Sequence, residues 1–155
     1  MIQKTNNRMT WCRILIILNL TFIWGNSMIP AEGSSMLSEW VREILSSVIP
    51  PAAESESGFL LRKLAHFSEF ACLGFLLSWH FAMVQQKKPC IAGTALLTGF
   101  LCACADETIQ LFSPGRGPSP VDVGIDTAGV AFGIGLLLLG QYIYQKNHKP
   151  MEALT

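Results

Sequence analysis

The sequence has 155 residues, of which 50% are hydrophobic and only 14% are charged, and its formal net charge is zero. This composition is typical of a small helical membrane protein with one domain, and it argues against a soluble globule. The sequence contains no basic stripe, so we exclude nucleic acid as a partner. The five cysteines lie in or beside apolar segments, which argues against a secreted disulfide framework.

The first apolar segment is expected to anchor the chain in the membrane. It runs over residues 11–29, which is barely the ~20 residues that a span requires. A basic leader precedes it, so a cleaved signal peptide is the competing interpretation. The sequence after Ser27 lacks a clean small-x-small cleavage site, and we therefore favour a retained anchor. Both interpretations place residue 30 on the outer side of the membrane.

Residues 36–49 have the pattern of an amphipathic helix, because their apolar side chains recur on one helical face and polar side chains fill the other. Pro50 and Pro51 end this pattern. A helix of this length rises only ~21 Å, which is too short to cross the ~30 Å apolar core of a bilayer. We therefore expect it to lie on the outer leaflet of the membrane.

Three further apolar segments are predicted to span the membrane, over residues 59–84, 90–112 and 122–145. Together with residues 11–29 they predict an all-α bundle of four transmembrane helices plus one interfacial amphipathic helix, in a single domain over residues 1–155. If the chain starts inside, most Lys and Arg residues fall on the inner side. This bias predicts that the N- and C-termini are cytoplasmic.

Polar side chains interrupt these apolar segments at one depth of the predicted bundle. They are Arg62, Lys63, His66 and Glu69 in the second span, Asp106, Glu107 and Gln110 in the third, Arg116 and Ser119 in the loop, and Asp122 and Asp126 in the fourth. The connectivity brings them to the outer side, because the second span enters there, the third leaves there and the fourth re-enters there. An ionisable side chain near the bilayer centre costs roughly 2.5–3.5 kcal/mol. We therefore interpret the group as one functional site whose charges pair with one another.

Two glycines of the fourth predicted span indicate how that helix packs. Gly129 and Gly133 lie on the same helical stripe as Asp122 and Asp126. Their small-xxx-small spacing is typical of a close approach by a second membrane helix. This spacing therefore lets another helix approach the stripe that carries the aspartates.

The basic residues of this group are candidates for binding an anionic head group. Arg62, Lys63 and Arg116 carry the positive charges, and a guanidinium binds phosphate through paired hydrogen bonds. The further candidate binding residues are Gln110, Ser119, Asp122 and Asp126. The expected partners are the lipid bilayer and an anionic lipid head group or cell-wall precursor.

The remaining residues of the group are candidates for catalysis. His66 and Glu69 share one helical face and could form an oriented general base. Asp106 and Glu107, with Asp122, could supply acid catalysis or bind a divalent cation through oxygen atoms. No cofactor is required by these patterns, and a divalent cation is the one candidate ion. A purely structural network of interhelical ion pairs explains the same charges, so the sequence leaves open whether the protein is an enzyme.

Three spaced motifs run through residues 59–135. They are Lys63-x-x-His66-Phe67-x-Glu69-Phe70, Asp106-Glu107-x-x-Gln110-x-Phe112, and Arg116-x-x-Ser119-x-x-Asp122 followed by Gly129. In this order and spacing they resemble the VanZ-like family of bacterial membrane proteins, whose namesake is associated with low-level teicoplanin resistance. The resemblance implies a multi-pass protein of the bacterial cell membrane with a role in glycopeptide resistance. The chain departs from the family pattern at Asp126, where Asn is usual, and this departure adds a negative charge.

These observations leave a small set of functions open. The first is an outward-facing charged site that binds or acts on a cell-envelope component, linked by the resemblance to teicoplanin resistance. The alternatives are a membrane enzyme that acts on a lipid-linked or phosphate-bearing substrate, and a structural or accessory membrane protein.

Overall fold

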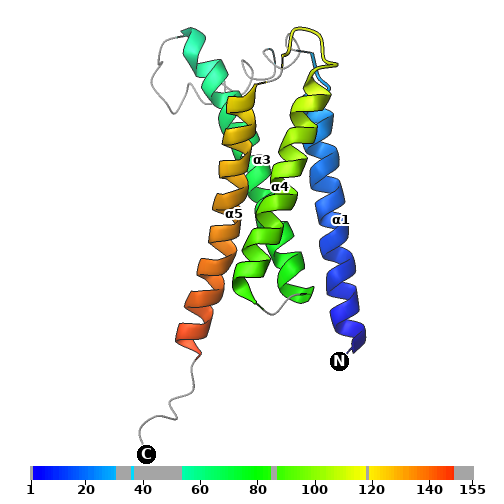
Figure 1. Cartoon of the computed structure of the whole chain (residues 1–155), viewed down its shortest axis with the longest axis vertical. Helices are drawn as coiled ribbons and strands as arrows, with labels where there is room; N and C mark the ends of the chain where they lie inside the picture. The colour runs from blue at the N-terminus through cyan, green and yellow to red at the C-terminus, as the bar shows by residue number, and fades with distance from the viewer. Residues whose placement is uncertain (1, 31–35, 37–53, 85–86, 118, 149–155) are drawn as a thin grey trace, which may run out of the picture.

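The computed structural model describes residues 2–30, 36, 54–84, 87–117 and 119–148, which form helices and turns with no strand among them. The helices in this part of the chain are α1 (Ile2–Ser27), α3 (Glu54–Val84), α4 (Lys88–Gln110) and α5 (Pro120–Asn147). Figure 1 shows them as a bundle of roughly upright helices, with the start of α1 and the end of α5 at the same end of the molecule. The predicted all-α fold is confirmed for these residues.

Three of the described helices are long and apolar enough to cross a membrane. They are the segments Leu60–Val84, Lys88–Gln110 and Pro120–Asn147. The predicted spans over residues 59–84, 90–112 and 122–145 are thus confirmed as candidate spans. The first predicted span is not among them, although α1 has 26 residues and a length of ~39 Å. The sequence of α1 includes Arg13, Asn19 and Asn26, which lower its apolar character.

The helix boundaries differ from the predicted ones because apolar character marks only the middle of each helix. α1 begins at Ile2 rather than at residue 11, and α3 begins at Glu54 rather than at residue 59. Prolines in the first turn start α4 and α5, since the fixed φ of proline suits that position. The predicted amphipathic helix over residues 36–49 lies outside the described residues apart from residue 36.

α3 and α4 each pack against the three other described helices, and α3 makes the more extensive contacts. Its contact with α5 is the most extensive in the described structure, and glycines make it possible. A Cβ on Gly129 would lie 2.5 Å from the Phe67 carbonyl oxygen, and a Cβ on Gly133 would overlap the backbone of Ala71. The predicted close approach at these two glycines is confirmed.

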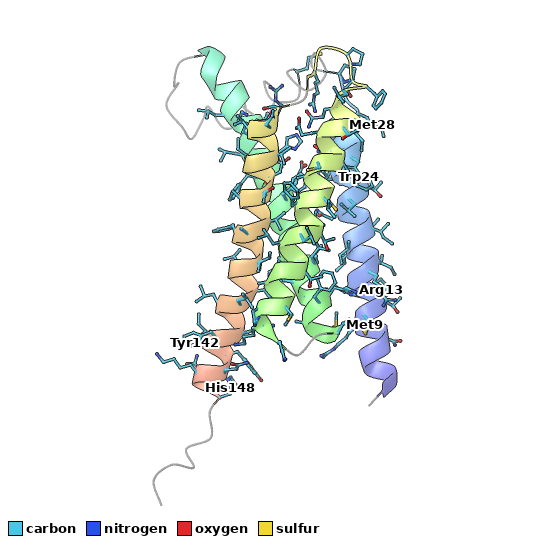
Figure 2. All side chains as sticks on the ribbon, in the orientation of Figure 1. Met9, Arg13, Trp24, Met28, Tyr142 and His148 are labelled. Carbon is cyan, nitrogen blue, oxygen red and sulfur yellow. The ribbon has the colours of Figure 1, made fainter. Side chains whose placement is uncertain are left out.

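The core of the bundle lies between α1, α3, α4 and α5. Its buried apolar side chains are Ile23, Phe70, Leu73, Leu77, Ala95, Ala103, Val130 and Ile134. Polar side chains collect at one end of this core, where α3 begins, α4 ends, residues 111–119 form a loop and α5 begins. Figure 1 places these segments together at the upper end of the bundle. In Figure 2, Trp24 and Met28 of the α1 end lie toward the same end, whereas Arg13, Tyr142 and His148 lie toward the other.

Candidate functional site

A polar cavity of about 150 Å³ lies at this end of the bundle. Its walls come from α3, the end of α4, the loop over residues 111–119 and the start of α5. The lining residues are Arg62, Lys63, His66, Glu107, Gln110, Gly115, Arg116, Gly117, Asp122, Ile125 and Asp126. Three segments that are far apart in the sequence therefore contribute ionisable groups to one space, as their predicted common depth requires.

An ion pair closes one side of the cavity. Lys63 Nζ of α3 contacts Asp122 Oδ1 of α5, and both side chains remain partly exposed. Asp122 also has its backbone N–H near the Ser119 hydroxyl, which accepts this hydrogen bond at 3.3 Å. Ser119 is thus the N-cap of α5, a position that serine favours because its side chain replaces a missing helical acceptor.

Glu107 connects the end of α4 to the start of α5. Its Oε2 accepts a hydrogen bond of 2.7 Å from the backbone N–H of Ser119. Its Oε1 is buried and has no hydrogen-bond partner among the described residues. One carboxylate oxygen therefore holds the loop, whereas the other has no hydrogen-bond partner among the described residues.

Two aspartates are the most deeply buried acids of the site. Asp106 has an exposed fraction of 0% and Asp126 has one of 1%. Asp106 Oδ2 accepts a hydrogen bond of 2.9 Å from Gln110 Nε2 and lies 4.0 Å from His66 Nδ1. Asp106 Oδ1 and both oxygens of Asp126 have no hydrogen-bond partner in the described part of the chain.

Arg116 reaches the cavity from the loop. The loop turns at Gly115, whose φ of 76° is a left-handed conformation that glycine adopts without strain. The Arg116 backbone N–H donates to the Ser113 carbonyl at 3.2 Å. Burial, together with the nearby Arg62, lowers the pKa of the Arg116 guanidinium, but an arginine still stays charged at neutral pH. Its Nε is buried and has no hydrogen-bond partner among the described residues.

The side chain of Glu69 has a different hydrogen-bond partner from the one that the sequence predicted. Glu69 was expected to orient His66, but Glu69 Oε1 accepts a hydrogen bond of 2.9 Å from Asn26 Nδ2 of α1. The carboxylate within 4.0 Å of His66 is that of Asp106. The expected His66–Glu69 base is therefore not part of the described geometry, because the Glu69 side chain is held by α1 and is not among the residues that line the cavity.

The other predicted residues come together as expected. Arg62, Lys63, His66, Glu107, Gln110, Arg116, Asp122 and Asp126 line the cavity, and Asp106 and Ser119 contact residues that line it. Sequence reasoning missed Asn26, which bonds Glu69, and Ser113, whose hydroxyl donates to the Ser27 carbonyl at 2.7 Å. The available signal for Asn26 was a polar amide inside an apolar segment, at the end of the segment that meets the charged residues.

Fold and site together define a helical membrane protein whose apolar spans carry a charged cavity at one end. Comparison with family models gives a match to the VanZ/LLP1 family over residues 10–141. The chain belongs to this family, and the resemblance inferred from the motifs is confirmed. No curated protein and no solved structure matches the chain.

Proposed function

We propose that the protein is a membrane-embedded binding protein whose cavity holds the anionic head group of a cell-envelope component. Arg116 supports this proposal most directly, because it lines the cavity and its buried Nε has no hydrogen-bond partner among the described residues. Leaving a buried donor unpaired costs about 1–3 kcal/mol. A phosphate oxygen in the cavity would remove that cost and would form a charge-assisted hydrogen bond.

The other lining groups suit a head group that carries both phosphate and hydroxyl or ammonium groups. Arg62 and Lys63 add positive charge beside Arg116. Glu107 Oε1 is an acceptor with no partner among the described residues, and it suits a donor on the same ligand. The cavity of about 150 Å³ is smaller than the ~300–1,000 Å³ of pockets that enclose drug-sized ligands. It therefore suits a head group whose acyl or prenyl chains stay in the bilayer.

The surroundings of the cavity favour a ligand that is anchored in lipid. Leu111 and Phe112 at the start of the loop over residues 111–119, and Val121 in the first turn of α5, are exposed apolar side chains near the cavity. Exposed apolar side chains next to a polar cavity are suited to contact with lipid tails. We propose that the cavity opens on the outer side of a bacterial cell membrane, with cytoplasmic termini, as the distribution of Lys and Arg predicts.

The proposal is tested by binding of a soluble phosphate lipid to the purified full chain. Short-chain phosphatidic acid is titrated against the protein in neutral detergent, with the matched diacylglycerol as the uncharged control ligand. Arg116→Gln should weaken binding of phosphatidic acid by roughly 10- to 150-fold, which corresponds to the loss of a charged hydrogen bond of about 1.5–3 kcal/mol. Arg13→Gln is the matched control, because Arg13 lies toward the opposite end of the bundle (Figure 2). Equal affinity in wild type and Arg116→Gln, or equal affinity for both lipids, would refute the proposal.

In cells, family membership leads us to propose that this binding supports tolerance of teicoplanin. Wild type and Arg116→Gln are expressed at matched membrane abundance in a susceptible bacterium, and survival is measured against teicoplanin. Protection by the wild type alone is the expected result. Equal protection by both chains would make the cavity charges structural. Release of inorganic phosphate from a lipid phosphate by purified wild type would instead identify an enzyme.

A further inference from the structure

We propose that His66, Asp106 and Asp126 form a binding site for a divalent transition-metal ion. Each of the three residues comes from a different membrane helix, namely α3, α4 and α5. One ligand atom from each residue, an imidazole nitrogen or a carboxylate oxygen, lies within 4.8 Å of the other two. Three such ligands from three elements are a typical donor set for a protein-bound metal ion.

Several buried polar atoms of these three residues have no hydrogen-bond partner among the described residues, and a bound cation would give them one. Asp106 Oδ1, both oxygens of Asp126 and His66 Nδ1 are buried without a hydrogen-bond partner among the described residues. Both aspartates are almost completely buried, and an unpaired buried carboxylate costs several kcal/mol. A divalent ion between them would balance two carboxylates and a neutral imidazole with no net charge. Arg62 and Arg116 are the basic groups near His66, and they compete with a metal ion for these acids. Zinc titration distinguishes an ion-binding site from pairing with the arginines.

The distances fit an ion after a small adjustment of side chains. Zinc binds nitrogen and oxygen ligands at about 2.0–2.2 Å in a tetrahedral arrangement, so two ligands of one ion are about 3.3–3.6 Å apart. A pair of ligand atoms at the limit of 4.8 Å must therefore approach by about 1.2–1.5 Å. Rotation of an aspartate side chain provides such a movement without a change in the helices.

The surrounding residues indicate which ion would bind and from where it is reached. One imidazole with two carboxylates favours Zn²⁺ over Mg²⁺ or Ca²⁺, which prefer oxygen ligands alone. Gln110 Nε2 holds Asp106 Oδ2 at 2.9 Å, in the way that outer residues orient metal-binding carboxylates. His66 and Asp126 also line the cavity, so a fourth coordination position is accessible from it. That an anionic head group would occupy this position rests on the proposed function, whereas the metal site itself does not.

Zinc titration of the purified full chain tests the site. The affinity tag is removed, bound metal is stripped with a chelator, and Zn²⁺ is titrated calorimetrically in neutral detergent that contains no phosphate. Wild type should bind one ion, and His66→Gln and Asp126→Asn should each weaken binding by roughly tenfold or more. His80→Gln is the matched control, because residue 80 lies ~21 Å along α3 from residue 66. Failure of the wild type to bind, or equal binding by both variants and wild type, would overturn the proposal.

A second measurement on wild type keeps the test valid even where a variant fails to fold. X-ray absorption of the zinc-loaded protein should show only nitrogen and oxygen neighbours at about 2.0–2.2 Å, without sulfur at about 2.3 Å. Sulfur neighbours would assign the ion to the free cysteines, among them Cys102 and Cys104, and would overturn the proposal. Because no lipid or phosphate is present, this result does not depend on the proposed head-group binding.

Discussion

Replacing Gly133 by alanine should separate α5 from α3 and destabilise the bundle. A Cβ at this position would overlap the Ala71 carbonyl oxygen and would lie 2.7 Å from the Phe75 backbone nitrogen. Ordinary van der Waals contact begins at 3.4 Å. The Phe75 contact alone requires the backbones to move apart by about 0.7 Å, and the overlap with Ala71 requires a larger movement. Backbone atoms cannot rotate away as a side chain can. The cost is therefore that of an overpacked contact, about 1–3 kcal/mol.

The matched control is Gly135→Ala on the same helix. An added Cβ at Gly135 meets no atom within 4 Å, so the substitution keeps only the intrinsic helix preference of alanine. That preference stabilises a helix by up to about 1 kcal/mol. The thermal midpoint of the detergent-solubilised protein should fall by about 2–12 °C for Gly133→Ala, at 2–4 °C per kcal/mol, and should stay constant or rise for Gly135→Ala.

Gly133→Ala should also change the affinity of the proposed metal site for Zn²⁺. Gly133 lies seven residues, or ~10.5 Å, along α5 from Asp126, and a carboxylate oxygen of Asp126 lies near a ring nitrogen of His66 in α3. A wider spacing between the helices would separate ligand atoms that already lie up to 4.8 Å apart. We expect Gly133→Ala to weaken Zn²⁺ binding, and Gly135→Ala to leave it unchanged. If the Gly133→Ala variant is as stable as the Gly135→Ala variant, the close approach at Gly133 does not stabilise the contact between α3 and α5.

Two further predictions concern hydrogen bonds around the site. Asn26→Ala should cost about 1–3 kcal/mol, because it removes the partner of Glu69 Oε1 and leaves a half-buried carboxylate unpaired. Asn19→Ala on the same helix is its control, since the Asn19 amide oxygen has no hydrogen-bond partner among the described residues; equal shifts in thermal midpoint would refute the assignment. Ser119→Ala should cost about 1 kcal/mol by removing the N-cap of α5, and Ser119→Thr should retain most of the stability. The Asp122 N–H also donates to the Ser119 carbonyl at 2.9 Å, a bond that Ser119→Ala keeps. The thermal midpoint therefore measures this effect, and an unchanged midpoint in Ser119→Ala would contradict it.

The shared depth of the charged residues was predictable because connectivity alone determines it. Once three apolar segments alternate in direction, polar residues at the start of one and the end of the next must meet at one side. The close approach at Gly129 and Gly133 was also predictable, since residue spacing along one helix indicates which face packs. The shared depth follows from the order of the helices along the chain, and the close approach follows from residue spacing within one helix.

The partners of individual side chains were not predictable in the same way. His66 and Glu69 share a face of α3, yet His66 lies near Asp106 of α4 and Glu69 bonds to Asn26 of α1. The rotation of each helix about its axis decides such contacts, and side chains separated by one turn can meet different neighbours. Packing between helices sets that rotation, and a single sequence does not reveal it.

The bonds at the polar end join segments that are far apart along the chain. Ser113 donates to a carbonyl 86 residues earlier, at the end of α1, and Asn26 bonds a carboxylate 43 residues later in α3. During synthesis the α1 members of these two bonds are made before their partners, and contacts of long sequence separation form slowly. The buried acid Asp126 belongs to the last described helix. The cavity therefore cannot be completed before the first turns of α5 have been synthesised, because Asp122 and Asp126 belong to them.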